Sequence, residues 1–139
     1  MNFKNQISTT REQSEKLLAL GLKPETADMS ISIKDNPNCY CSARAYKDWN
    51  GYWKYNRFVI PAWSLSRLLE MMPQYIDERE EVLLMIEPPL IAYYDTRYKG
   101  QQHFTTNPNI FDNCIAMIDW LIRNGHFNKE YLIEQDNEL

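Results

Sequence analysis

The chain has 139 residues, 44% of them hydrophobic and 24% charged, which is the composition of one globular domain and excludes a disordered chain. Fifteen basic residues face 19 acidic ones, and the resulting net charge of -4 argues against binding to nucleic acid or anionic lipid through surplus Lys and Arg. Three cysteines, no apolar export signal after Met1 and no apolar run of about 20 residues predict a soluble protein of the reducing cytoplasm with free thiols.

The first predicted element is a helix over about residues 10–20. Two reciprocal capping pairs fit its start, Thr9 with Glu12 and Thr10 with Gln13. Gly21 supplies the left-handed backbone that ends many helices. The apolar stripe between these signals is narrow, which predicts a surface helix with one buried edge.

A short strand is predicted around residues 29–33, and an aromatic-rich stretch follows it. Within that stretch, Asn50-Gly51 is the strongest short signal for a hairpin turn, because both residues accept positive φ. We therefore predict a hairpin over about residues 40–60, with a loop as the alternative.

Two more helices are predicted from their end signals. The second covers about residues 65–72, with Ser64 as its N-cap and a proline directly after it. The third covers about residues 109–124, where Asn107 is the expected cap and Gly125 ends the helix.

An antiparallel meander is predicted over about residues 81–106, with strands at 81–87, 91–98 and 101–106. Five consecutive apolar residues at 82–86 predict a first strand covered on both faces. We expect the third helix to bury one set of side chains against this strand: Met117, Ile118, Trp120 and Leu121 against Val82, Leu84 and Ile86.

Together these elements predict an α+β fold, a small antiparallel sheet packed with three helices. We expect a single domain over residues 1–139, with a polar, acidic tail that frays from about residue 128.

Cys39 and Cys41 form a Cys-x-Cys pair, which is half of the usual ligand set of a zinc site. A second cluster is missing, because Cys114 falls on the apolar stripe of the third helix and the two histidines, His103 and His126, are isolated. We therefore predict no metal and no cofactor, with the cysteines acting as small apolar residues. A cysteine nucleophile would need a nearby imidazole such as His103, and spacing alone does not provide one.

Acid–base chemistry could use the carboxylates of Glu81, Glu87 and Asp95. Ordinary strands carry such residues on their solvated faces, and Asp95 shares a strand face with Arg97, where the two can pair. The four glycines are explained as helix ends or turns, which argues against a phosphate-binding loop. No catalytic residue is assigned.

The most unusual feature is the density of aromatic side chains at 46–58. A strand sends neighbouring side chains to opposite faces, so Tyr52 and Trp53 cannot both point inward. We predict an exposed partner-binding surface comprising Tyr46, Trp49, Tyr52, Trp53, Lys54, Tyr55 and Arg57. Buried core rings are the alternative, and stacking on single-stranded nucleic acid is a weaker one.

Three segments carry a family resemblance: 10–29 (TREQSEKLLALGLKPETADM), 60–73 (IPAWSLSRLLEMMP) and the predicted third helix, which ends in 120–125 (WLIRNG). Read together, they resemble a group of short proteins of bacterial prophages and other mobile elements that has no established activity. The resemblance covers about half of the chain. It implies no catalytic residues and favours an accessory role with a partner.

Two classes of function remain. The first is a non-enzymatic accessory or interaction protein that binds a protein partner or associates with itself. The second is a small enzyme whose site is assembled from residues far apart in the sequence. A membrane partner is not expected, and nucleic acid is the least favoured partner.

Overall fold

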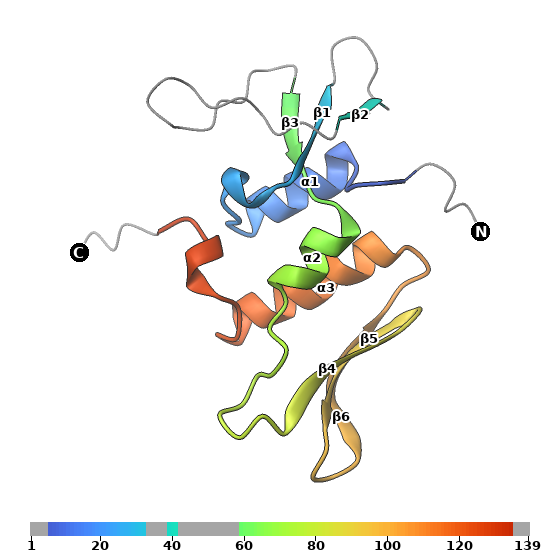
Figure 1. Cartoon of the computed structure of the whole chain (residues 1–139), viewed down its shortest axis with the longest axis vertical. Coiled ribbons are helices and arrows are strands. Elements are labelled where there is room, and N and C mark those ends of the chain that lie inside the picture. The colour runs from blue at the N-terminus through green and yellow to red at the C-terminus, as the bar shows by residue number, and fades with distance from the viewer. Residues whose placement is uncertain (1–5, 33–38, 42–58, 135–139) are drawn as a thin grey trace. The chain divides into compact units, whose positions relative to one another are not determined.

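The computed structural model describes residues 6–32, 39–41 and 59–134, in which three α-helices and two antiparallel three-stranded sheets form an α+β fold (Figure 1). The predicted fold class and the three helices are confirmed. The chain divides into two compact units, Met1–Arg67 with Asn128–Leu139, and Leu68–Phe127. The single domain over residues 1–139 stays a prediction.

Helix α1 spans Arg11–Ala19 in the first unit and begins at a complete capping box. The hydroxyl of Thr10 accepts from the backbone N–H of Gln13 at 3.2 Å, and the amide oxygen of Gln13 accepts from the N–H of Thr10 at 2.9 Å. Gly21 has a φ of 101°, and the next N–H, that of Leu22, donates to the carbonyl of Leu17 at 3.2 Å. Both predicted ends of the helix are confirmed.

The sheet of the first unit has the order β2-β1-β3. Its strands are β1 (Met29–Ser32), β2 (Cys39–Cys41) and β3 (Val59–Ala62), and both outer strands pair antiparallel with β1. The short strand predicted near residue 29 is confirmed. The hairpin expected over about residues 40–60 stays a prediction. In the described residues at its two ends, β2 and β3 lie on opposite sides of β1 and both pair with it. The turn Asn50-Gly51 lies outside the described residues.

Helix α2 spans Leu65–Met71, after the short 3-10 helix η1 (Pro24–Thr26) and strands β1 to β3. The hydroxyl of Ser64 accepts from the backbone N–H of Arg67 at 3.2 Å, which confirms the predicted N-cap. The carboxylate of Asp28 accepts from the N–H of Ser64 at 2.8 Å and thereby joins the start of α2 to the residue before β1.

In the described residues, the C-terminal tail makes backbone pairs as far as residue 133, and the fraying expected from about residue 128 stays a prediction. A short 3-10 helix, η2, spans Lys129–Tyr131. Leu132 then forms an antiparallel bridge with Leu22, and the N–H of Ile133 donates to the carbonyl of Gly21 at 2.7 Å. These backbone pairings satisfy polar groups that a frayed tail would leave to water.

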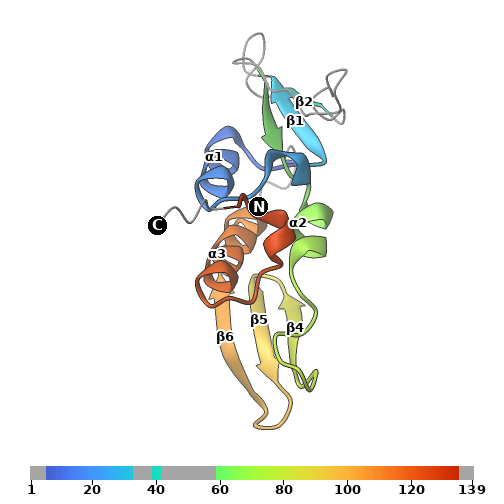
Figure 2. The same ribbon diagram turned by 90° about the vertical axis from the view of Figure 1, so that its left-hand side faces the viewer.

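The second unit is a three-stranded meander with a helix on one face. Its strands are β4 (Val82–Glu87), β5 (Leu90–Asp95) and β6 (Gly100–Thr106), in the order β4-β5-β6. Helix α3 spans Ile110–Arg123 and packs against β5 and β6 (Figure 2). The predicted meander is confirmed.

The prediction that β4 is covered on both faces is wrong. The strand lies beside β5 at one side of the meander, so Leu84 is only half-buried and Ile86 is 39% exposed. Val82 at the start of β4 is buried as expected, but the middle strand β5 holds more of the buried side chains: Ile91, Ala92 and Tyr93. On α3 the expected side chains Met117, Ile118 and Leu121 are buried, whereas Trp120 is half-buried.

The N-cap of α3 is Asn109 instead of the predicted Asn107. The amide oxygen of Asn109 accepts from the N–H groups of Phe111 and Asp112 at 2.9 and 3.0 Å. Asn107 accepts from the N–H of Asn109 at 2.8 Å, so it shapes the turn that precedes the helix. The end of α3 is as predicted, with Gly125 at a φ of 73°.

Candidate functional site

The partner surface predicted from the aromatic segment stays a prediction. Its residues Tyr46, Trp49, Tyr52, Trp53, Lys54, Tyr55 and Arg57 lie outside the described residues. The side chains of Cys39 and Cys41 are likewise outside the described part of the structure. The candidate site below is therefore built from the second unit.

Strand β6 forms one side of the meander, and the direction of its backbone groups follows from a single hydrogen bond. The N–H of Asn107 donates to the carbonyl of Pro89 at 3.4 Å, just beyond the paired ends of β5 and β6. Hydrogen-bonded pairs alternate along an antiparallel ladder. Thr105 and His103 therefore direct their N–H and C=O groups toward β5.

Phe104 and Thr106 direct their N–H and C=O groups away from the sheet. Among the described residues, no hydrogen bond reaches these outward groups. The register shift between Tyr93 and Tyr94 marks a bulge at Gln102, where the regular part of the strand begins. An edge strand with unpaired backbone groups is a template for a further strand.

The chemistry of this edge suits a protein partner. Gly100–Thr106 contains no charged residue and no proline, which are the usual protections of an exposed edge. The side chain of Phe104 is 52% exposed and alternates with His103 and Thr105, so it points to the face of the sheet away from α3. The edge thus offers backbone groups together with one large apolar side chain.

The opposite side of the meander is covered within its own unit. The N–H of Ile76 donates to the carbonyl of Val82 at 3.1 Å, and the N–H of Leu84 donates to the carbonyl of Gln74 at 2.9 Å. Tyr75 forms the bridge with Leu83 between these bonds. Within the described chain, β6 is therefore the open edge of this sheet.

An aromatic cluster lies on the other face of β6. The rings of His103 and Trp120 are stacked with centroids 4.3 Å apart, and His126 lies 5.6 Å from the same indole. Burial lowers the pKa of His103 below its usual value, which keeps its ring neutral. Stacked rings present their faces and not their in-plane nitrogen lone pairs, so we interpret the cluster as support for β6. The described residues contain no metal-binding group of three or more His, Cys, Asp or Glu side chains.

Tyr93 is the fully buried member of the aromatic cluster around Trp120. Its ring lies 6.2 Å from that of Trp120, and its hydroxyl donates to the carbonyl of Pro73 at 2.7 Å. Burial raises the pKa of Tyr93 above its usual value. The tyrosine is a fixed, protonated donor in the core.

Arg97 pairs with Asp95 and Glu81, two of the three carboxylates considered for acid–base chemistry. Its Nε and Nη2 donate to the two carboxylate oxygens of Asp95 at 3.0 and 2.8 Å. Its Nε also lies 2.9 Å from Oε2 of Glu81. Hydrogen bonding from Arg97 lowers the pKa of Asp95, so this carboxylate stays charged and is a poor proton donor.

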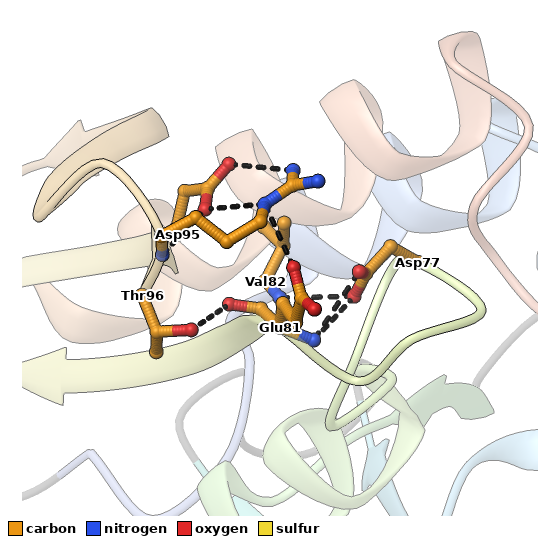
Figure 3. A network of polar contacts seen from close by, with 6 residues as sticks. Asp77, Glu81, Val82, Asp95 and Thr96 are labelled. Atoms are coloured by element: carbon orange, nitrogen blue, oxygen red, sulfur yellow. Dashed lines mark hydrogen bonds and ion pairs between the residues drawn. The ribbon is translucent and has the colours of Figure 1, made fainter.

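Asp77 and Thr96 extend the contacts of Arg97, Asp95 and Glu81 into a polar network that joins neighbouring loops (Figure 3). The carboxylate of Asp77 accepts from the N–H groups of Glu81 and Val82, both at 2.9 Å, and Thr96 donates its hydroxyl to the carbonyl of Glu81 at 2.9 Å. Glu87 is exposed at the far end of β4 and does not join the network. We interpret the network as structural, which agrees with the expected pairing of Asp95 and Arg97.

Cys114 is a buried residue of α3, as its place on the apolar stripe predicts. Its thiol is free, and burial raises its pKa to about 12. The thiolate is the nucleophilic form of cysteine, so this side chain is inert at neutral pH.

The sequence did not identify the open edge or the histidine cluster, because it does not show which outer strand of the meander is covered or how α3 packs on the sheet. The available signal was weak: the predicted third strand of the meander, residues 101–106, contains no charged residue and no proline. His103 and His126 meet at Trp120 only because β6 and α3 pack together.

No helix in the described part of the chain has the length and apolar character needed to cross a membrane. Comparison of the chain with protein-family models, with curated proteins and with solved structures finds no match. The candidate site therefore rests on the residues of this chain alone.

Proposed function

We propose that this chain is a non-enzymatic interaction protein that binds a protein partner by strand addition to β6. The observation that carries the proposal is the open edge, where Phe104 and Thr106 direct their backbone groups away from β5. In strand addition, main-chain hydrogen bonds provide affinity and alternate side chains provide specificity.

Phe104 gives the edge an apolar contribution as well. Its side chain is 52% exposed, so covering it with a partner removes about half of its surface from water. Covering half of a phenylalanine side chain contributes about 1 kcal/mol. This supports a partner that covers both the strand edge and the face away from α3.

The alternative of a small enzyme receives less support from the titratable groups of the second unit. Asp95 is held as a charged carboxylate by Arg97, and the thiol of Cys114 is buried and protonated. His103 is stacked face to face on Trp120. The resemblance to proteins of mobile elements, itself a prediction, favours the same accessory role.

A pair of variants at Thr106 tests the proposal. Because the N–H of this residue points away from β5, Thr106→Pro removes an outward donor without removing a bond of the β5–β6 ladder. Thr106→Ala shortens the same side chain and keeps the donor. Affinity capture from a lysate of the source cells, read by mass spectrometry, should retain partners with the wild type and Thr106→Ala and lose them with Thr106→Pro.

Two controls make this result interpretable. Thr106→Pro should unfold at the temperature of the wild type, whereas Thr105→Pro should unfold at a lower temperature, because Thr105 donates toward β5. If a folded Thr106→Pro captures the same partners as the wild type, β6 is not the binding edge and the proposal is wrong.

A further inference from the structure

We propose that the partner at β6 is a second copy of this chain, paired antiparallel about a two-fold axis that passes through Thr105. This inference rests on the proposed function and names the partner. The proposed pairing joins the two meanders into one continuous sheet, in which β6 of one copy lies beside β6 of the other.

The direction of the backbone groups selects the register. An axis at Thr105 sets Phe104 of each copy opposite Thr106 of the other, and both members of such a pair exchange their outward N–H and C=O groups. An axis at Phe104 would instead require the bulged Gln102 to pair with Thr106. An axis at Thr106 would set Phe104 opposite Pro108, which has no N–H to donate.

The side chains fit the same register. Phe104 opposite Thr106 is an aromatic residue beside a β-branched one, and Thr105 opposite its own copy is a threonine pair. Both are favourable combinations across neighbouring antiparallel strands. In this register, each residue from Phe104 to Thr106 therefore faces a favourable partner in the other copy.

The absence of charge favours a second copy over a charged peptide. A two-fold interface brings each residue near its own kind, so any charged cluster on it meets the same sign. Gly100–Thr106 carries no charge, whereas the whole chain carries -4. The electrostatic repulsion that opposes the dimer therefore comes from outside the edge, and added salt should strengthen association by screening it.

The proposed β6–β6 pairing involves only a few residues, so the dimer should be weak. A pairing of single edge strands is smaller than the roughly 1,200 Å² that marks the lower limit of standard interfaces. We therefore expect a reversible dimer that forms at micromolar or higher concentrations of the chain.

Sedimentation over a concentration series measures this dimer directly with the full chain. The wild type should pass from monomer to dimer as the concentration rises. Thr106→Ala loses the contact with Phe104 but keeps the outward N–H, so it should do so at only slightly higher concentrations. Thr106→Pro removes one net hydrogen bond from each copy, which should raise the dissociation constant about 30-fold. A dimer of unchanged strength in a folded Thr106→Pro overturns the inference.

Disulfide trapping tests the register and does not depend on the folding of the proline variant. In a chain carrying Cys39→Ser and Cys41→Ser, Thr105→Cys places two thiols at a pair with Cα atoms about 4.5 Å apart, within the range of a disulfide. The control, Gln101→Cys, lies about 26 Å from its own copy in this register. Thr105→Cys should form covalent dimers under mild oxidation, and Gln101→Cys should form them no faster than random collision.

The failure of this inference can be told apart from the failure of the proposed function. A wild type that stays monomeric at high concentration, or equal trapping of Thr105→Cys and Gln101→Cys, overturns self-pairing. If capture of another protein still depends on the N–H of Thr106, the proposed function stands without the dimer. If that capture is also independent of Thr106, both are wrong.

Discussion

The imidazole ring of His103 lies parallel to the indole ring of Trp120, with centroids 4.3 Å apart and planes that differ by 3°. The contact joins β6 to α3, so the open edge of the sheet is supported from one face by a half-buried histidine. Burial lowers the pKa of His103. The support is therefore strongest while the imidazole is neutral.

The stability of the protein should fall as the pH drops below about 6.5, the usual pKa of histidine. The unfolded chain binds a proton at His103 more readily than the folded chain, so acid favours unfolding until the lowered folded pKa is passed. His103→Gln should lack this part of the pH dependence. Urea unfolding from about pH 7.5 to about pH 5 measures it, and identical pH dependence in both proteins would contradict the account.

The amide of Asn113 ties α3 to the turn between β4 and β5. It is fully buried, and its Nδ2 donates to the carbonyl of Pro89 at 2.6 Å. Asn113→Asp turns this donor into an acceptor and buries an unpaired charge, which should cost about 3–5 kcal/mol of unfolding free energy at neutral pH.

Asn113→Ala is the matched control for that change. It removes the 2.6 Å donor to the carbonyl of Pro89, which keeps its 3.4 Å hydrogen bond from Asn107, and it adds no charge, so it should cost about 1–3 kcal/mol. Chemical unfolding at neutral pH compares the two variants. A loss for Asn113→Asp no larger than that for Asn113→Ala would show that the site is open to water.

Two neighbouring residues of α3 should respond differently to truncation. Leu121 is fully buried, so Leu121→Ala should cost about 2–5 kcal/mol through lost contacts and a cavity. Ile122 is half-buried, and Ile122→Ala should cost clearly less. Urea unfolding of both variants measures the difference, and a larger loss at Ile122 would mean that the buried face of α3 is misplaced.

Local signals in the sequence predicted local structure well. Thr10 with Gln13 and the glycine after α1 act within a few residues of the helix ends, so their effects do not depend on the rest of the chain. The cap of α3 was missed by two residues because Asn107 and Asn109 carry the same side chain on either side of Pro108.

The meander was predicted with the observed strand order, but the burial of its individual strands was not. An apolar run such as 82–86 is compatible with a central strand or with an outer one, because the hydrophobicity of a strand does not show which segments pack beside it. In the structure the deeper burial falls on β5, at Ile91 and Tyr93, and Phe104 on β6 is left half-exposed. The open edge depends on which outer strand is covered by another segment, and the pairing of residues 74–76 with β4 has no signal in the sequence. The aromatic surface at 46–57 stays a prediction.

The charge of Asp95 should depend on Arg97. Hydrogen bonding from Arg97 is the main cause of the lowered pKa of Asp95, so Arg97→Met should raise that pKa toward its usual value. Because the folded pKa is lowered, the pairing stabilises the protein above about pH 4 and is lost as the pH falls through the folded pKa. An NMR titration of the Asp95 carboxyl carbon measures the shift.

The control for that titration is Arg123→Met. Arg123 pairs with Asp119 on the surface of α3 and should leave Asp95 unchanged. If Asp95 titrates alike in the wild type and in Arg97→Met, the guanidinium is not the cause of its lowered pKa.

Residue-resolved amide hydrogen exchange on β6 tests the open edge most directly. In dilute protein the N–H groups of Phe104 and Thr106 should exchange rapidly, while those of His103 and Thr105 are protected by β5. At high protein concentration Phe104 and Thr106 should gain protection, and His103 and Thr105 should change little. Equal protection of all four amides in dilute protein would contradict the account, because the edge would then already be covered.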